Sequence, residues 1–207
     1  MQSIQTVSEN TIYVGASDRR LAKFENLFPI PRGVSYNAYV ILDEKTALLD
    51  TADASVGAQF LENVAAALDG RKLDYLIVDH MEPDHAAMIE AVLVRWPDLR
   101  LVVNAKTLPM LKMYFPTDSA AFDDALVVKE GDTLDLGKHK LTFVMAPMVH
   151  WPEVMMTFDT TTGTLFSADA FGTFGALEGA LFADEVDFAG KWLDDADGSL
   201  YAVADAV

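Results

Sequence analysis

The chain has 207 residues, 51% of them hydrophobic, so it is long enough to bury a substantial core. Its 15 Lys and Arg residues against 32 Asp and Glu residues give a formal charge of −17, which makes nucleic acid and anionic membranes poor partners and cations good ones. The absence of cysteine excludes disulfides, thiolate catalysis, and zinc ribbons or iron–sulfur clusters ligated from within the chain.

Strands and helices alternate in the first half of the chain. Short apolar runs rich in Val, Ile and Tyr predict strands at residues 11–17, 35–42, 46–51, 75–80 and 99–105. Apolar side chains at helical spacing predict an amphipathic helix over 54–70, with Gly70 as its C-cap. Two further helices are expected near 86–95 and over 107–114. The N-terminus lacks a secretion signal and no window reaches a membrane span, so we expect a soluble, cytoplasmic protein.

The second half of the chain predicts mainly hairpins. Strand-like runs begin at residue 125, and the sequence "DTTTG" at 159–163 predicts a turn between two apolar arms. A Gly- and Phe-rich segment follows at 170–185, and an acidic helix is expected near 185–196. Interleaved strands and helices followed by hairpins indicate a mixed α/β (α+β) class, with layered sheets covered by helices in a single domain.

The stretch "YLIVDHMEPDHAAMI" at 75–89 contains the main candidate for chemistry. His80, Glu82, Asp84 and His85 lie within six consecutive positions, where a predicted strand leads through a loop into a helix beginning near Ala86. Imidazole and carboxylate ligands together suit iron, manganese or zinc. An arbitrary acidic loop is more often simply solvated, but the density of ligand types at this junction favours a metal site.

Two later residues could join this group. His150 and Asp169 each follow an apolar run, so both could converge with the first loop at one edge of the sheets. A lone residue in such a position is more often a cap or turn residue, and its value depends on its neighbours. His139, flanked by Lys138 and Lys140, is predicted to be solvated and is given no role.

The motifs taken together resemble the flavodiiron proteins, also called A-type flavoproteins. The resemblance extends over about residues 1–196 and rests on H-x-E-x-D-H at 80–85, on His150 followed by Trp-Pro, and on "PIPRGVSYNAYVI" at 29–41 and "FSADAFGTFGAL" at 166–177. It implies a metallo-β-lactamase-like αββα sandwich. It also implies a non-haem diiron centre that reduces dioxygen to water or nitric oxide to nitrous oxide, with electrons from a redox donor protein.

The resemblance also implies a set of metal ligands. One iron would be held by His80, Glu82 and His150, the other by Asp84 and His85, with Asp169 bridging both. Hydrolases of this fold usually carry histidine where this chain has Glu82, and a carboxylate there favours iron redox chemistry over zinc hydrolysis. A metal-dependent zinc hydrolase and a non-catalytic remnant remain as alternatives.

The end of the chain departs from the family. Flavodiiron proteins continue past "KWLDDA" to a further histidine ligand and then to a flavodoxin domain carrying FMN, whereas this chain ends "DGSLYAVADAV". We therefore expect a C-terminally truncated diiron domain at 1–196 and a divergent tail at 197–207, with FMN only in the missing domain. One iron or none would then bind and activity would be impaired. An exposed strand edge would favour a homo-oligomer.

Overall fold

The computed structural model describes residues 4–115, 120–172, 174–177 and 179–185. The chain divides into two compact units, the first formed by Met1–Ala16 and Tyr36–Ala168, the second by Ser17–Ser35 and Asp169–Val207. The predicted tail at 197–207 and the boundary at 196 lie outside the described residues, as does nearly all of the acidic helix expected near 185–196.

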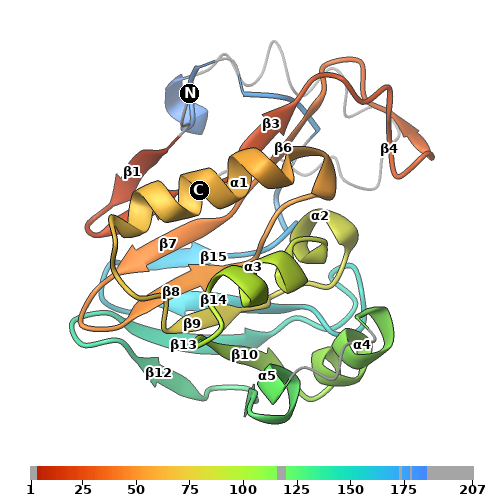
Figure 1. Ribbon diagram of the computed structural model, residues 1–207. Helices are drawn as coiled ribbons and strands as arrows, with labels where there is room; N and C mark the ends of the chain where they lie inside the picture. Colours follow the sequence, from red (N-terminus) through yellow and green to blue (C-terminus); the bar gives the residue numbers. More distant parts are fainter. Residues whose placement is uncertain (1–3, 116–119, 173, 178, 186–207) are drawn as a thin grey trace. The chain divides into compact units, whose positions relative to one another are not determined.

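The first unit contains a seven-stranded sheet (Figure 1). Its strands are, in spatial order, β1 (Gln5–Ser8), β2 (Thr11–Tyr13), β7 (Tyr39–Leu42), β8 (Thr46–Leu49), β9 (Tyr75–Ile77), β10 (Arg100–Asn104) and β11 (Leu126–Val128). Neighbours from β1 to β8 pair antiparallel, and those from β8 to β11 pair parallel. The carboxyl ends of the parallel strands therefore meet at one edge, where α/β sheets commonly place ligands.

A four-stranded antiparallel sheet shares its core with the first. Its order is β12 (Thr133–Asp135), β13 (Lys140–Met145), β14 (Met155–Asp159) and β15 (Thr164–Phe166). Buried apolar side chains from both sheets form one cluster, made of Ile41, Ala47, Leu49, Ile77, Val102, Val128, Leu134, Leu136, Leu141, Phe143, Met155 and Phe166. The predicted layering of sheets is confirmed, as is the turn predicted at 159–163, which joins β14 to β15.

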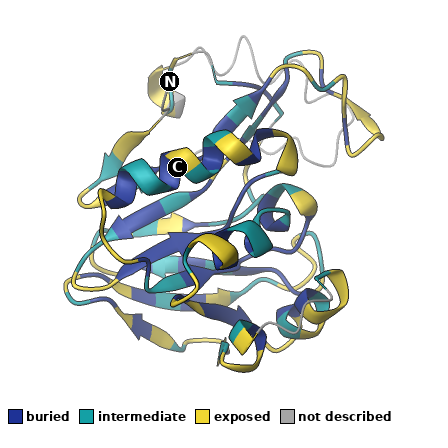
Figure 2. Ribbon diagram, in the orientation of Figure 1, coloured by how far each residue is buried: buried dark blue, intermediate teal, exposed yellow. Residues whose placement is uncertain are grey.

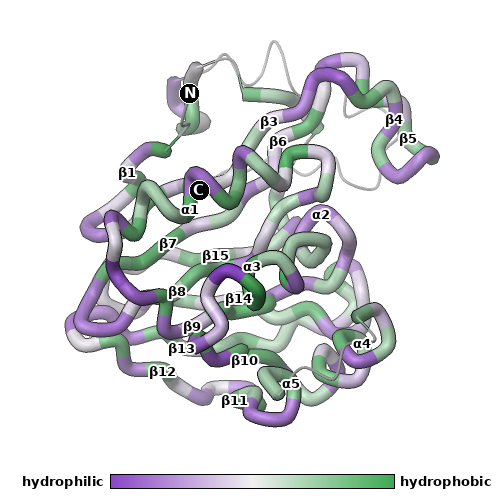
Figure 3. The backbone as a smooth tube through the Cα atoms, in the orientation of Figure 1, coloured by the Kyte–Doolittle hydropathy of each residue, from purple (hydrophilic) through white to green (hydrophobic). Residues whose placement is uncertain are grey.

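Helices contact the seven-stranded sheet. The first unit contains η1 (Ala54–Val56), α1 (Gly57–Leu68), α2 (Pro83–Ala86), α3 (Ile89–Arg95), α4 (Thr107–Tyr114) and α5 (Ala120–Asp123). Helix α1 contacts β7, while α4 and α5 contact β10. Along α1, buried and exposed segments alternate (Figure 2) and so do hydrophobic and hydrophilic ones (Figure 3), as expected for a helix with one face on a sheet. No helix among the described residues is long and apolar enough to cross a membrane.

The second unit is smaller and has its own aromatic cluster. It contains the hairpin of β4 (Lys23–Phe24) and β5 (Phe28–Pro29), most of the strand pair β3 (Ala16–Asp18) and β6 (Val34–Tyr36), and η2 (Ala183–Glu185). The ring of Phe174 lies 5.0 Å from that of Phe24 and 6.4 Å from that of Phe28. A backbone hydrogen bond from Ala176 to Arg32 joins the two chain segments of this unit.

Several elements end earlier than the sequence predicts. Strand β9 stops at Ile77, so His80 lies three residues beyond the strand and not at its end. The helix expected near 86–95 is two helices, α2 and α3, and α2 begins at Pro83 because proline suits the first helical position. Asp84 and His85 consequently lie inside a short helix and not in a loop.

The prediction that His139 is solvated is wrong. Its side chain is fully buried, and its Nδ1 lies 2.8 Å from Oδ2 of Asp159. Its backbone N–H donates to Oδ2 of Asp43 at 2.6 Å, which ties the β12–β13 turn to the β7–β8 turn. The flanking lysines are at the surface, where Lys138 pairs with Glu9 and Lys140 with Asp135. Their exposed positions are the reason why the sequence predicts that the whole turn is solvated.

Asp159 is held as a carboxylate by its neighbours. Burial alone would raise its pKa, but hydrogen bonds from the Thr162 hydroxyl, His139 and the Thr161 backbone N–H together hold the pKa of Asp159 below its usual value. The ionised form therefore stabilises the fold. Because the folded pKa is lowered, this contribution is complete above the unfolded pKa and disappears as the pH falls through the folded pKa.

We predict that Asp159→Asn lowers the free energy of unfolding by about 1–3 kcal/mol at pH 7, because a buried charged acceptor is lost. Urea unfolding of the two proteins measures the difference. The gap between wild type and variant should narrow as the pH falls below about 4, because the unfolded wild-type chain takes up a proton there before the folded chain does. A gap that stays constant down to pH 2 would contradict the assignment.

Candidate metal centre

The first ligand segment runs from the end of β9 into α2. Glu82 occupies the N-cap position of α2, with an extended backbone, and Pro83 begins the helix. The backbone N–H of His85 donates to the carbonyl oxygen of Glu82 at 2.9 Å, which closes a tight turn. The side chains of His80, Glu82 and His85 are all buried. One short segment therefore presents several polar side chains inside the protein, where they need partners.

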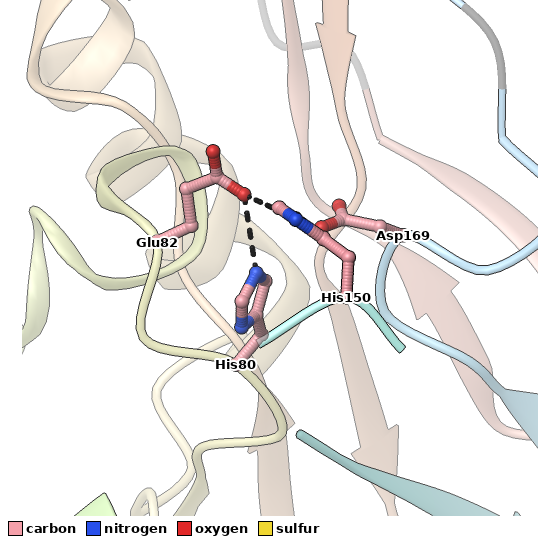
Figure 4. A group of neighbouring side chains, drawn as sticks. All are labelled: His80, Glu82, His150 and Asp169. Carbon is pink, nitrogen blue, oxygen red and sulfur yellow. Dashed lines mark hydrogen bonds and ion pairs between the residues drawn. The ribbon is translucent and has the colours of Figure 1, made fainter. Parts of the chain in front are cut away.

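A second segment, the loop between β13 and β14, brings His150 to the same place. Oε2 of Glu82 lies 3.2 Å from Nε2 of His80 and 2.7 Å from Nε2 of His150 (Figure 4). The centroids of the two imidazole rings are 5.2 Å apart. His80 and Glu82 thus converge around one point with His150, which lies 68 residues beyond Glu82 in the chain.

The other predicted ligand pair lies alongside. Nε2 of His85 is 3.6 Å from Oδ2 of Asp84, and the His85 ring lies 5.1 Å from that of His80. The first unit therefore brings together five of the six predicted ligands. The sixth, Asp169, is the first residue of the second unit, three positions beyond the end of β15.

Two carboxylates that sequence reasoning missed orient the imidazoles from outside. Oε1 of Glu153 lies 2.8 Å from Nδ1 of His80, and Oδ2 of Asp50 lies 2.9 Å from Nδ1 of His85. An ionised carboxylate can only accept, so each Nδ1 donates a proton and each Nε2 is turned toward the cluster. Asp50 follows strand β8 directly and Glu153 follows His-Trp-Pro, but nothing local in the sequence shows which imidazole either one meets.

Burial and hydrogen bonding act in opposite directions on Glu153. Burial would raise its pKa, but the hydrogen bonds from His80 and from the backbone N–H of Met81 hold the pKa of Glu153 below its usual value. Glu153 is thus a carboxylate, as its role of acceptor for His80 requires.

Asp79 has a structural role beside the first ligand segment. Its Oδ1 accepts from the Thr157 hydroxyl at 2.8 Å, and its backbone N–H donates to Oδ1 of Asp50 at 2.7 Å. Burial, reinforced by the Asp50 carboxylate, raises the pKa of Asp79 well above its usual value, although the Thr157 hydrogen bond opposes this. Asp79 therefore fastens the ligand segment to β14.

The donor set fits a divalent cation. Because Nδ1 of His80 donates to Glu153, a neutral His80 directs the Nε2 lone pair at the lone pairs of Glu82. Protonating both His80 and His150 would relieve this, but it would place two ring cations 5.2 Å apart in a partly buried site. A metal cation satisfies both nitrogens and the carboxylate together. Two imidazoles and one carboxylate are also the ligand type of non-haem ferrous sites.

Comparison with known proteins gives a consistent result. Residues 34–192 match the family model described as ODP family beta lactamase. The anaerobic nitric oxide reductase flavorubredoxin of Klebsiella pneumoniae is 38% identical over 183 residues, which are 87% of this chain and 37% of that protein. A flavorubredoxin homologue of Escherichia coli O157:H7 is also 38% identical, with 44% of its length covered. The chain thus spans less than half the length of these relatives.

Solved structures give the same fold. The rubredoxin oxygen:oxidoreductase of Desulfovibrio gigas superposes with a TM-score of 0.85 at 30% identity, over 91% of this chain and 46% of that one. The flavodiiron protein of Giardia intestinalis superposes with a TM-score of 0.83 at 27% identity, over 92% and 45%. These similarities confirm the predicted metallo-β-lactamase-like fold and the predicted resemblance to flavodiiron proteins.

We predict that Asp50→Asn weakens Co²⁺ binding by about 10–100-fold, because the amide turns a donor toward Nδ1 of His85 and so reverses the tautomer that directs Nε2 to the metal. Titration followed by visible Co²⁺ absorption measures this. Asp53→Asn is the matched control, since Asp53 caps η1 at the surface and asparagine caps equally well. Equal affinities for Asp50→Asn and wild type would contradict the orienting role of Asp50.

Proposed function

Because the chain belongs to the ODP beta-lactamase family and shares the metallo-β-lactamase-like domain of the flavodiiron proteins, we propose that it forms a non-haem diiron centre for the reduction of dioxygen or nitric oxide. The observation that supports this most directly is the meeting of the His80 and His150 Nε2 atoms at one oxygen of Glu82. The names of the relatives, one a nitric oxide reductase and one an oxygen oxidoreductase, support the reaction class.

The first metal position would use His80, His150 and Glu82. When bound there, ferrous iron supplies redox chemistry, because two imidazoles and one carboxylate leave coordination positions open to a small ligand. The protein's own part is to hold the three donors in place. The Trp151 indole and the His80 imidazole make a T-shaped contact, with ring centroids 5.3 Å apart at 89°, and this contact restricts rotation of the imidazole.

The second metal position would use Asp84 and His85, with Asp169 as a ligand shared by both positions. Asp84 and His85 are adjacent in α2, and Asp50 orients the imidazole. The support for Asp169 is chain continuity, because it lies three residues beyond β15, whose partner β14 begins just after the loop that carries His150. A carboxylate with two oxygens is suited to bridge two cations.

Glu82 favours this proposal over zinc hydrolysis. Its carboxylate is an anionic oxygen ligand that adds charge to a site already surrounded by Asp50, Asp84 and Glu153. Excess negative charge stabilises a cation that must pass through a higher oxidation state, whereas hydrolytic zinc keeps one oxidation state throughout. A non-catalytic domain would have no need for two separately oriented imidazoles.

Electrons would come from a flavin or a redox donor protein. The relatives' names refer to a flavin and to rubredoxin. We propose that a redox donor protein of this kind is a partner of the chain. Dioxygen and nitric oxide are both small and uncharged, so the described ligands admit either. The self-association and the impaired activity that the sequence analysis expects are still predictions.

The iron content and reactivity of the chain test the proposal. We expect anaerobic reconstitution with Fe²⁺ to load one or two irons per chain, and mixing with dioxygen or nitric oxide to oxidise the iron within seconds. Stopped-flow absorption follows the oxidation, and gas chromatography detects nitrous oxide. Binding of Zn²⁺ in preference to Fe²⁺, with hydrolysis of a thioester or lactam and inertness toward both gases, would refute the proposal.

Asp169 is tested separately by substitution. We expect Asp169→Ala to lower the Fe²⁺ stoichiometry and to weaken the remaining site by about 10-fold or more, because a shared ligand is removed. Asp184→Ala is the matched control, since it removes an exposed carboxylate from the same unit at η2. Equal metal binding by the two variants, measured by elemental analysis after dialysis, would exclude Asp169 from the ligand set.

A further inference from the structure

We propose that Glu153 is a positioning residue that fixes the two ligand segments relative to one another. It belongs to the segment that carries His150, and its side chain hydrogen-bonds the segment that carries His80. The inference rests on the metal centre of the proposed function and adds a residue that is no ligand. The proposed role has two parts, one concerning the position of His80 and one concerning its protonation at Nδ1. One buried carboxylate fixes both the place of His80 and the tautomer that it presents.

The carboxylate of Glu153 binds two successive residues of the first segment. Oε1 accepts a hydrogen bond from Nδ1 of His80 at 2.8 Å and another from the backbone N–H of Met81 at 3.0 Å. The Glu153 and His80 side chains are both fully buried, so water does not compete for these hydrogen bonds. His80 can therefore neither rotate nor exchange its Nδ1 proton for an Nε2 proton without breaking a buried charge-assisted bond.

The backbone of Glu153 is anchored at the end of β10. Nδ2 of Asn104 donates to the Glu153 carbonyl oxygen at 2.6 Å, and Nζ of Lys106 donates to the Pro152 carbonyl oxygen at 3.0 Å. Oδ1 of Asn104 accepts in turn from the backbone N–H groups of Lys106 and Thr107 at the start of α4. A rigid strand end of the large sheet thus fixes the backbone from which both Glu153 and His150 project.

The two ligands consequently depend on one another through Glu153. His150 lies three residues before Glu153, and its Nε2 meets the same Glu82 oxygen as Nε2 of His80. A shift of the β13–β14 loop would carry Glu153 with it and so turn His80. The geometry therefore assigns Glu153 an effect on metal affinity, in addition to the contribution that its buried hydrogen bonds make to folding stability.

The chain supplies a matched control for a purely structural role. His139 and Asp159 form the same kind of pair, with Nδ1 and Oδ2 2.8 Å apart and both side chains fully buried, but neither belongs to the ligand cluster. Asp159→Asn removes a buried charge next to an imidazole, as Glu153→Gln does. A structural role alone predicts that both variants lose stability and that neither changes metal affinity.

The test measures Zn²⁺ affinity and imidazole tautomers in the full 207-residue chain. Competition with a chromophoric chelator gives the Zn²⁺ affinity. Because Zn²⁺ is diamagnetic, ¹⁵N-edited NMR of histidine-labelled protein can also detect the ring N–H protons in the metal-bound state. We expect Glu153→Gln to weaken Zn²⁺ binding about 10-fold, since the amide oxygen still accepts but the charge is lost. Glu153→Leu should weaken it about 100-fold and abolish the His80 Nδ1–H signal, while the His85 signal held by Asp50 persists.

Unchanged Zn²⁺ affinity in Glu153→Gln would overturn the inference, as would an equal loss in Asp159→Asn. If Glu153→Leu fails to fold, Glu153→Gln alone decides, because its amide is nearly isosteric with the carboxylate. These outcomes are distinguishable from failure of the proposed function. A wild-type chain that binds metal with the expected Glu153 dependence but is inert toward dioxygen and nitric oxide would refute the reductase and leave the positioning role established.

Discussion

Nε2 of the buried His80 and Nε2 of the partly exposed His150 meet one oxygen of the buried Glu82 in the first unit, and the arrangement of the ligand segments follows from satisfying these three atoms. The side chains of His80 and Glu82 are buried away from water, so the polar atoms of each need a hydrogen-bond partner or a cation. Their neighbours are arranged accordingly. The parallel strands β8, β9 and β10 end at one edge of the sheet. Asp50 directly follows β8 and orients His85, His80 lies beyond the end of β9, and Asn104, the last residue of β10, binds the backbone of Glu153.

Carboxylates decide the orientation of each buried imidazole in the first unit. His80, His85 and His139 lie with Nδ1 2.8–2.9 Å from Glu153, Asp50 and Asp159 respectively. The pairing is the same in all three, but its consequence differs with what lies beyond Nε2. Around His80 and His85 further carboxylates converge, and this is the arrangement on which the proposed metal centre rests. Around His139 the same pairing only fastens two turns to one another.

The layered fold and the grouping of His80, Glu82, Asp84 and His85 were predictable because their signals are local. The apolar runs of β7, β8, β9 and β10 and the spacing of Phe60, Val64 and Leu68 in α1 reflect burial that each segment needs by itself. The boundaries were less predictable. Pro83 begins α2 three residues before the expected helix, and β9 stops before His80, because hydrogen bonds of the ligand turn replace the strand ladder there.

His139 shows how local context misleads, since two exposed lysines surround a side chain that the β7–β8 and β14–β15 turns enclose from elsewhere in the chain. The sequence by itself determined the alternation of strands and helices, the absence of sulfur ligands and the clustering of His80, Glu82, Asp84 and His85, because these depend on residue type and spacing. Only the tertiary structure decided that His150 meets Glu82 and that Asp50 and Glu153 orient the imidazoles. Hydrogen bonds between segments up to 73 residues apart depend on how the two sheets face each other, and no local pattern encodes that.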